Sequence, residues 1–401
     1  MNVCMIAYTF YEGDNRVMRY AEALAARGDH VDVLALGREG QTKEEVLNGV
    51  RVLRLQSRKK NERTKWSYLL RIVMFFIRAL VKVTLKHARR PYGLVHVHSV
   101  PDFLVFAAVV PRLTGARIVL DIHDLSPELY GTKFGSASGS AVFSALLTVE
   151  RLSAAFANHV IAPNHIWQQR LIDRSVPQSK CSVFMNYPDP NVFRRCGRTR
   201  HDGKFVVLYP GTLNWHQGVD IAIRAFAKVR PHVSNSEFHI YGEGPSRNDL
   251  VRLASELGIP EAVVFHRPVS LREISTVIED ADLGVVPKRS DSFGDEAFST
   301  KTLEFMMLGV PIILSETTVD RYYFNDDVVS FFPSGDADVL AECMLKLIED
   351  ADLRSRQVAR AQAFVATYSW DTRKGEYLSL VDHLTNFARP AESLAASHGD
   401  L

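Results

Sequence analysis

The chain of 401 residues has only four cysteines, and no two of them form a C-x-x-C pair. Their spacing fits no zinc site, so neither a disulfide scaffold nor a structural zinc is predicted, and the simplest compartment is a reduced, cytosolic one. An apolar run of about 18 uncharged residues, the length of a membrane-spanning helix, is missing, and the first residues lack the basic start of a secretory signal. With 48 basic and 46 acidic residues, the net charge of +2 excludes a general polyanion binder.

Short apolar runs alternate with helical patterns along the chain. This alternation is typical of parallel sheets covered by helices on both faces, and it predicts two similar α/β domains of Rossmann type. We expect strands at residues 3–8, 31–36, 50–55, 94–98, 118–122, 160–162, 183–185, 205–209, 237–241, 263–266, 283–286 and 311–314. We expect helices at residues 16–26, 219–229, 250–257, 274–280, 301–308 and 340–348, and from residue 370 onward.

A polar and basic loop over residues 186–203 marks the expected domain boundary. The N-terminal domain is assigned to residues 1–195 and the C-terminal domain to residues 196–373. Ligands of such sheets lie outside the carboxyl ends of the strands. Two domains that face each other are therefore expected to bind their substrates in the cleft between them.

Residues 58–90 carry 11 basic residues and one acidic residue, a net charge of +10 in a nearly neutral chain. Apolar residues recur there at helical spacing from Trp66 onward, and Arg71, Arg78 and Lys82 fall on the opposite side. A basic amphipathic helix with Trp at one end is typical of an element that lies on an anionic membrane surface. Packing of the apolar stripe on the sheet is the structural alternative. Binding of nucleic acid is the other, but no recognised nucleic-acid motif accompanies the basic residues.

Two glutamates bracket the start of a helix in the second half of the chain. Glu296 lies in the loop before this helix and Glu304 about one turn inside it, with seven residues between them. Lys301 shares a helix face with Glu304. The unpaired backbone N–H groups around Ser299, Thr300 and Lys301 form an anion site. Carboxylates that accept from sugar hydroxyls, next to a helix start that meets phosphate, indicate a site for a phosphorylated sugar.

This stretch resembles the E-x7-E element of the retaining glycosyltransferases of the GT-B fold, family 4. Other segments, over nearly the whole chain, resemble the same family, and the set is specific for it. They are the helix and strand within 17–33, DIHDLSPE at 121–128, YPGT at 209–212, QGVD at 217–220, YGEGP at 241–245 and DLGVVP at 282–287. The resemblance implies two Rossmann-like domains that face a deep cleft, with a C-terminal helix, residues 374–401, that crosses back to the N-terminal domain.

The resemblance also implies roles for single residues. Glu304 would bind the ribose of the nucleotide, and Glu296 would hold hydroxyls of the donor sugar, with Asp295 as its alternative. His123 would reach from the N-terminal domain to the donor sugar near the reacting carbon. The loop residues that would line the diphosphate and the nucleotide are Gly211, Thr212, Gly242 and Gly244, although these glycines are also good turn residues.

Two cations of the family are missing here. Thr212 and Gln217 stand where the family has an Arg and a Lys. A leaving diphosphate needs positive charge or oriented dipoles as its charge develops. We therefore expect Lys301 and the start of its helix to supply the charge, with Arg267 or Lys288 as further candidates.

The family's N-terminal Gly-Gly loop is replaced by residues 13–16. Arg16 is therefore expected to approach the phosphates or the acceptor, with Asp124 on the same side. His96 and His98 alternate on one expected strand, share a face and are interpreted as structural, with His98 near the cleft. No cluster of His, Asp and Glu has the spacing of a metal site, and no metal ion or cofactor is expected besides the nucleotide sugar co-substrate.

Together these features predict a retaining, metal-independent hexosyltransferase with a nucleotide diphosphate sugar as donor, uridine being favoured over guanosine or adenosine. A lipid-linked saccharide of bacterial polysaccharide biosynthesis fits as acceptor, because the basic helix would bring the N-terminal domain to a membrane. The protein would then be cytoplasmic and peripheral, on the inner face of the cell membrane. Two alternatives remain: a non-catalytic GT-B-like scaffold or partner-binding subunit, which the missing cations favour, and a nucleotide-sugar epimerase on the same fold, which the family 4 loops argue against.

Overall fold

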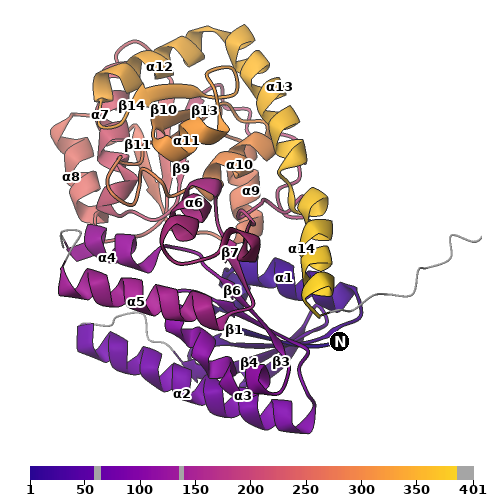
Figure 1. Cartoon of the computed structure of the whole chain (residues 1–401). Helices are drawn as coiled ribbons and strands as arrows, with labels where there is room; N and C mark the ends of the chain where they lie inside the picture. Colours follow the sequence, from indigo (N-terminus) through magenta and orange to yellow (C-terminus); the bar gives the residue numbers. More distant parts are fainter. Residues whose placement is uncertain (58–64, 135–139, 386–401) are drawn as a thin grey trace, which may run out of the picture.

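The computed structural model describes residues 1–57, 65–134 and 140–385. Two α/β domains lie one above the other in Figure 1, joined by a connection between Val183 and Phe205. The predicted boundary between residues 195 and 196 lies within this connection. Its second half is bonded to the C-terminal domain, since Arg198 pairs with Asp282 at 2.6 Å.

The N-terminal domain is built on an eight-stranded sheet of order β3-β4-β2-β1-β5-β6-β7-β8, parallel except for β3, which is antiparallel to β4. Apart from the edge strand β3, the chain starts in the middle, moves outward on one side and then outward on the other, as in a Rossmann sheet. The order therefore reverses between β1 and β5. The strands are β1 (Asn2–Phe10), β2 (His30–Gly37), β3 (Glu44–Leu47), β4 (Val50–Ser57), β5 (Leu94–His98), β6 (Arg117–Asp121), β7 (His159–Ala162) and β8 (Cys181–Val183).

The C-terminal domain repeats this plan with six parallel strands in the order β11-β10-β9-β12-β13-β14. Here the order reverses between β9 and β12. The strands are β9 (Phe205–Pro210), β10 (Ser236–Tyr241), β11 (Val263–His266), β12 (Leu283–Val286), β13 (Ile312–Glu316) and β14 (Ser330–Pro333).

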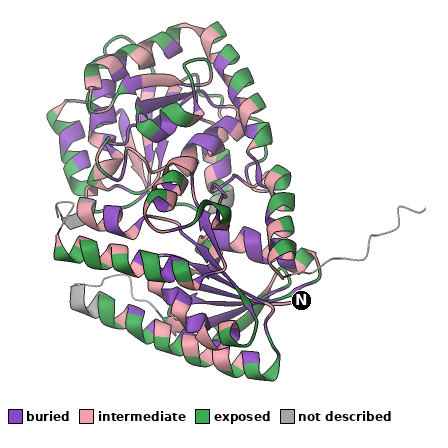
Figure 2. Ribbon diagram, in the orientation of Figure 1, coloured by how far each residue is buried: buried purple, intermediate pink, exposed green. Residues whose placement is uncertain are grey.

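Helices cover both sheets, and the strands are correspondingly buried (Figure 2). One continuous apolar cluster contains buried residues of both domains, among them Tyr187 of the connection and Leu303 of the C-terminal domain. The helices of the N-terminal domain are α1 (Asn15–Ala26), α2 (Lys65–Arg89), α3 (Val109–Leu113), α4 (Ser126–Phe134), α5 (Ala141–Phe156) and α6 (His165–Arg174). Those that follow are α7 (Val219–Val229), α8 (Arg247–Glu256), α9 (Leu271–Glu279), α10 (Thr300–Leu308), α11 (Thr318–Tyr323), α12 (Ala337–Glu349), α13 (Ala351–Thr367) and α14 (Trp370–Thr385).

The last described helix, α14, leaves the C-terminal domain and packs on α1 of the N-terminal domain (Figure 1). Arg27, which follows α1, pairs with Asp382 of α14 at 2.6 Å, and the Tyr377 hydroxyl of α14 lies 3.0 Å from Nδ1 of His96 in β5. The crossing predicted from the family resemblance is thus present, and it starts at Trp370 rather than at residue 374. Residues 386–401 of the predicted crossover lie outside the described residues.

Helix α2 packs on the domain with a face that includes only part of its apolar stripe. Phe75, which lies among the cations on a helical projection, is fully buried and contacts Tyr8 edge-on, with ring centroids 5.2 Å apart. The apolar residues exposed along the helix are Leu69, Leu70, Val73, Met74, Ile77, Val81 and Leu85, between 38% and 61% accessible. The side chain of Trp66 and residues 58–64 lie outside the described part. Leu80 and Phe76 pack against the core of the N-terminal domain, so the alternative in which the stripe packs on the sheet accounts for only this part of it. Within the described residues, no helix combines the length and the apolar character required to cross a membrane.

Candidate active site

The candidate residues of both domains gather at the carboxyl ends of the strands, close to the points where the strand order reverses. In the N-terminal domain, β5 ends at His98, and β6 ends at Asp121, two residues before His123. In the C-terminal domain, Gly211 follows β9 and Gly242 follows β10. In doubly wound sheets this edge is where ligands bind.

Helix α10 begins at this edge without a side-chain cap. Ser299 is its N-cap residue, but its hydroxyl makes no capping bond, and Oγ is buried without a hydrogen-bond partner. The first backbone N–H groups of a helix have no intrahelical acceptor and carry the positive end of the helix dipole. An anion placed here would meet these N–H groups together with the Ser299 hydroxyl.

Lys301, in the first turn of α10, directs its ammonium group to the first loop of the C-terminal domain. Its Nζ lies 3.2 Å from Oε1 of Gln217 and 5.3 Å from the centre of the Tyr209 ring. A Cβ atom on Gly211 would come within 2.3 Å of Cε of Lys301, so the two residues are in close contact. The structure thus puts a cation beside Gln217, where the family carries its lysine. Burial lowers the pKa of Lys301 to about 8, although the Glu304 carboxylate opposes this.

Glu304 lies one turn further along α10. Burial raises the pKa of its carboxyl group to about 7, while Lys301 and, from the N-terminal domain, Arg19 lower it. A carboxyl group in this environment can accept or donate a hydrogen bond near neutral pH. It therefore suits vicinal hydroxyl groups, which both donate and accept.

The glycines of the C-terminal loops hold these loops against each other. A Cβ atom on Gly242 would lie 1.8 Å from the carbonyl oxygen of Gly211, and one on Gly244 would lie 2.3 Å from that of Leu213. Backbone packing is therefore sufficient to require glycine at residues 242 and 244. Thr212 is exposed, and its carbonyl accepts a hydrogen bond from the Tyr209 hydroxyl at 2.9 Å.

Glu296 is held across the domain interface. Arg170 of α6 forms an ion pair with Oε1 of Glu296, and Asn164 donates to its carbonyl oxygen at 2.9 Å. The other carboxylate oxygen, Oε2, is buried without a partner. Burial raises the pKa of Glu296, and Arg170 opposes this rise. No sequence pattern indicates a role for Arg170, because its partner lies 126 positions away.

Three further candidates named from the sequence have other partners or lie on the surface. Asp295 accepts from the Ser290 hydroxyl at 2.6 Å and from the Thr318 backbone at 3.1 Å, so it fixes its own loop. Lys288 is buried, pairs with Asp320 at 2.9 Å and donates to the Ala297 carbonyl at 2.7 Å. Arg267 is exposed. The geometry favours Glu296 over Asp295 and Lys301 over Lys288.

Asp121 is the centre of a buried polar network in the N-terminal domain. Arg16 donates to both of its oxygens, from Nε at 2.7 Å and from Nη2 at 2.6 Å. Nδ1 of His98 lies 3.1 Å from Oδ2 of Asp121, and Nε2 of His123 lies 3.2 Å from the same oxygen. Arg16 is only 4% exposed and holds Asp121, while its Nη1 is buried without a partner, so its expected approach to the phosphates or the acceptor stays a prediction. Asp124 follows His123 in the same loop and is partly buried.

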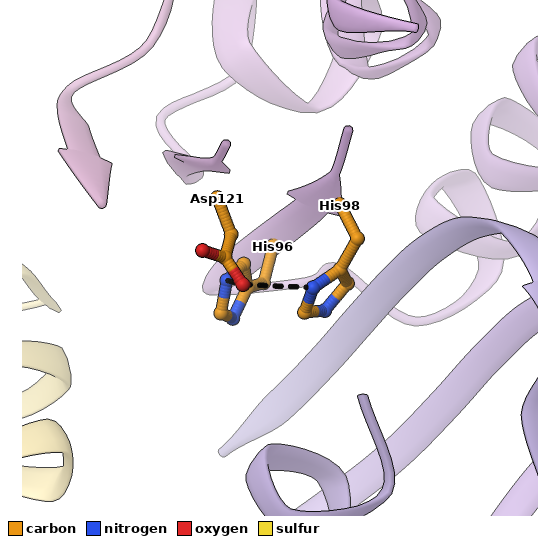
Figure 3. Close-up of side chains that lie close together, drawn as sticks. All are labelled: His96, His98 and Asp121. Atoms are coloured by element: carbon orange, nitrogen blue, oxygen red, sulfur yellow. Dashed lines mark hydrogen bonds and ion pairs between the residues drawn. The ribbon is translucent and has the colours of Figure 1, made fainter. Parts of the chain in front are cut away.

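The side chains of His96, His98 and Asp121 lie together at the ends of two neighbouring strands (Figure 3). One ligand atom from each lies within 4.8 Å of the others, so the spacing would admit a metal ion, contrary to the expectation that no such cluster exists. Both oxygens of Asp121 already accept from the Arg16 guanidinium, which would repel a divalent cation. We therefore interpret the cluster as a hydrogen-bonded network, in agreement with the structural role expected for the two histidines.

His123 is the member of this network that reaches the surface, with 22% of its side chain exposed. Burial alone would lower the pKa of His123, but the Asp121 carboxylate and, further away, Asp14 raise it above its usual value. Burial lowers the pKa of both His96 and His98. Of the three histidines, only His123 therefore has a raised pKa, and its Nε2 faces Asp121.

Comparison with known proteins covers nearly the whole chain. Residues 13–186 match the family model "Glycosyl transferase 4-like domain", and residues 197–364 match "Glycosyl transferases group 1". A glycosyltransferase of Methanocaldococcus jannaschii described as uncharacterized is 25% identical over 379 residues, 88% of this chain and 89% of that protein. The D-inositol 3-phosphate glycosyltransferase of Mycobacterium leprae is 32% identical over 178 residues, which are 41% of this chain and 39% of the relative.

Solved structures share the two-domain architecture. The sucrose-phosphate synthase of Thermosynechococcus elongatus superimposes with a TM-score of 0.80 over 97% of this chain and 100% of that chain, at 18% identity. HepE of Anabaena, solved in complex with UDP-glucose, superimposes with a TM-score of 0.72 over 96% of this chain and 100% of that chain, at 16% identity. At these identities the likeness shows the fold.

Proposed function

We propose a donor, an acceptor and a stereochemical course for this chain, which belongs to the glycosyltransferases of the GT-B fold, family 4 type. It transfers a hexosyl group from a UDP-sugar to a hydroxyl group of a lipid-linked saccharide, with retention of the anomeric configuration. The observation that carries the donor proposal is the cation-lined start of α10: an uncapped N-terminus, a buried unpartnered Ser299 hydroxyl and the Lys301 ammonium beside Gln217.

The residues at this edge suit a diphosphate and a nucleoside. Lys301 and the N–H groups of α10 stabilise the negative charge that develops on the leaving diphosphate. Glu304 accepts from the ribose hydroxyls, and Oε2 of Glu296, the oxygen left free by Arg170, accepts from a hydroxyl of the donor sugar. Uridine is supported by HepE, which was solved with UDP-glucose. Because Lys301 supplies the positive charge, no metal ion is needed.

Retention is proposed as a same-face substitution. The bond between the anomeric carbon and the phosphate oxygen breaks, the acceptor oxygen bonds to the same face, and its proton passes to the departing phosphate. A covalent double displacement would need a free carboxylate beside the reacting carbon. Asp121 is held by Arg16 at both of its oxygens, and in this proposal the free oxygen of Glu296 binds a hydroxyl group of the donor sugar, so neither carboxylate is assigned as the nucleophile. Catalysis then comes from positioning and charge stabilisation, with protonated His123 donating from Nδ1 to the donor.

The donor assignment can be tested without knowing the acceptor. UDP-sugars at 100 times their dissociation constant are expected to stabilise the protein by about 2.7 kcal/mol and to raise its melting temperature, whereas GDP- and ADP-sugars at the same concentration are not. The preferred UDP-sugar is also expected to be hydrolysed slowly, with release of UDP, at a rate unchanged by EDTA. Binding without any release of UDP would instead support the non-catalytic scaffold.

The exposed stripe of α2 supports a membrane-bound acceptor. The same helix carries the exposed Arg78 and the half-buried Arg71 and Lys82 on its basic side. Exposed apolar surface flanked by cations is complementary to an anionic bilayer, whose headgroups attract the cations while the acyl region receives the apolar side chains. We therefore propose that α2 lies on the inner face of the cell membrane and brings the N-terminal domain to the lipid-linked acceptor.

Substitution of the stripe tests this contact. The double variant Ile77→Glu/Val81→Glu is expected to lose at least about 10-fold in affinity for vesicles that contain phosphatidylglycerol, because two apolar side chains no longer enter the bilayer. Both positions are 52% exposed, so the melting temperature and the hydrolysis of UDP-sugar should not change. Val251→Glu, at an exposed position of α8, is the matched control. Equal vesicle binding by wild type and double variant in a flotation assay would contradict the proposal.

A further inference from the structure

The amino edge of the N-terminal sheet, opposite the edge that carries His123, contains a cavity of about 650 Å³. The starts of β1, β2 and β4 and the last turns of α2 form its walls, so four segments of the chain converge there. Five cationic side chains line it: Arg51, Lys82, Lys86, Arg89 and Arg90. The cavity belongs to neither the donor site nor the domain interface.

The acidic side chains of the cavity are already neutralised. Asp29 pairs with the N-terminal ammonium group at 2.8 Å and with Arg27 at 2.6 Å. Asp32 accepts from Lys86 at 3.0 Å and from the Tyr92 hydroxyl at 2.6 Å.

The remaining cations are in excess. Arg51 pairs with Glu44 outside the cavity. Lys82, Arg89 and Arg90 have no carboxylate partner within the described residues. As far as residues 1–57, 65–134 and 140–385 show, the cavity therefore keeps three positive charges without a carboxylate partner.

Compensation of the helix dipole accounts for only part of this charge. Cations in the last turn of a helix stabilise its carbonyl end, which explains Lys86 and Arg89. Lys82 lies a turn earlier and Arg90 follows the helix, yet both line the same cavity. Convergence of these side chains on a cavity of this size is what an anionic group with several oxygens requires.

Two exposed apolar residues of α2 are adjacent in sequence to residues that line the cavity. Val81 and Leu85, which directly precede Lys82 and Lys86, are 52% and 54% exposed. A ligand bound here would meet cations at one end and apolar side chains at the other. We propose that the cavity binds the phosphate headgroup of an anionic phospholipid, whose acyl chains lie along Val81 and Leu85. The site extends the membrane contact proposed above and is independent of the transferase reaction.

The test compares the triple variant Lys82→Gln/Arg89→Gln/Arg90→Gln with the charge-matched control Arg224→Gln/Lys346→Gln/Arg356→Gln, whose positions are exposed on the C-terminal domain. The probes are dihexanoyl-phosphatidylglycerol below its micellar concentration and inorganic pyrophosphate, each titrated by calorimetry against the full chain. The triple variant is expected to bind the lipid at least about 10-fold more weakly, since each basic residue near anionic lipid contributes about fivefold. The control should match wild type.

The two probes distinguish the sources of the phosphate. Tighter binding of the lipid than of pyrophosphate, lost in the triple variant, supports a membrane headgroup. Binding of pyrophosphate at least as tight, also lost in the triple variant, supports the anion site and assigns it to a soluble phosphate. Failure of wild type to bind either probe, or equal binding by the triple variant, would overturn the proposal. Slow hydrolysis of UDP-sugar is measured on the same proteins, so failure of the proposed reaction is recorded separately.

Discussion

Replacement of Lys301 with alanine is expected to reduce kcat for sugar transfer by about 100- to 1,000-fold, the loss that follows removal of one preorganised donor from a site of developing negative charge. Lys301 is the cation that lies beside Gln217 and Gly211, and the family's two loop cations are absent. A ground-state contact alone would change mainly KM, whereas stabilisation of the leaving diphosphate changes kcat. Steady-state kinetics with the preferred UDP-sugar separate these cases.

Removal of the Lys301 charge should not destabilise the fold, and the variant Lys301→Gln tests this. The pKa of Lys301 is about 8 in the folded state, lower than in the unfolded state, so burial of the charged ammonium group destabilises the folded state. This destabilisation is complete below pH 8 and disappears as the pH rises from 8 toward the ordinary pKa of lysine. Lys301→Gln is therefore expected to have an equal or higher melting temperature at pH 7. Lys228→Ala, at an exposed residue paired with Asp338, is the activity control. Wild-type turnover by Lys301→Ala would remove Lys301 from the mechanism.

The protonation of Lys301 also gives a pH signature. In the free enzyme the ammonium group is lost as the pH rises through about 8, so kcat/KM of wild type is expected to fall above this pH. Lys301→Arg keeps its charge at these pH values and should retain activity into the alkaline range, even if its larger head lowers the rate. A profile that is unchanged by this substitution would assign the alkaline limb to another group.

Most strands were predictable from local sequence, including the edge strand β11, but the edge strands β3, β8 and β14 were not. The expected bounds of β5, β11 and β12 coincide with those of the structure, because each is an apolar run that ends at a polar residue, a proline or a glycine. The strand expected at 183–185 is found at Cys181–Val183 instead. β3 contains Glu44 and Glu45 and is largely exposed, so only its antiparallel pairing with β4 makes it a strand. β14 is an edge strand that ends in proline, which a sequence pattern does not favour.

Site residues that belong to one short sequence motif were predictable, whereas contacts between residues far apart in the sequence were not. Lys301 and Glu304 share one short motif, and their place at the start of α10 follows from the sequence. The partner of Arg16 is 105 residues away and that of Arg170 is 126 residues away, so no spacing rule connects them. The bond of Arg16 to the buried Asp121 carboxylate was therefore not predictable from the sequence. The face on which α2 packs was likewise set by Phe75 contacting the sheet and only in part by the longer apolar stripe.

Substitution of Asp121 with asparagine is expected to lower kcat by about 100-fold, because His123 loses the partner that orients it. Asp121 contacts Nε2 of His123 at 3.2 Å and is itself fixed by Arg16. The variant should also lose about 3 kcal/mol of unfolding free energy at pH 7, since Arg16 remains buried without its counter-ion. Arg16 and His123 hold the pKa of Asp121 well below its usual range against the effect of burial, so this contribution is present above about pH 4 and is lost on acidification.

The pH dependence of activity shows whether Asp121 positions His123 or only stabilises the fold. Asp121 raises the pKa of His123, and burial would lower it in the variant. Wild type should therefore keep protonated His123, and its activity, to a higher pH than Asp121→Asn does, when both are assayed well below their melting temperatures. Asp282→Asn is the matched control: its carboxylate pairs with Arg198 and Arg200 at the amino end of β12, far from the site, and its loss should change stability but not the pH profile. Unaltered pH dependence in Asp121→Asn would make Asp121 a structural residue, and His123 would then act in its neutral form.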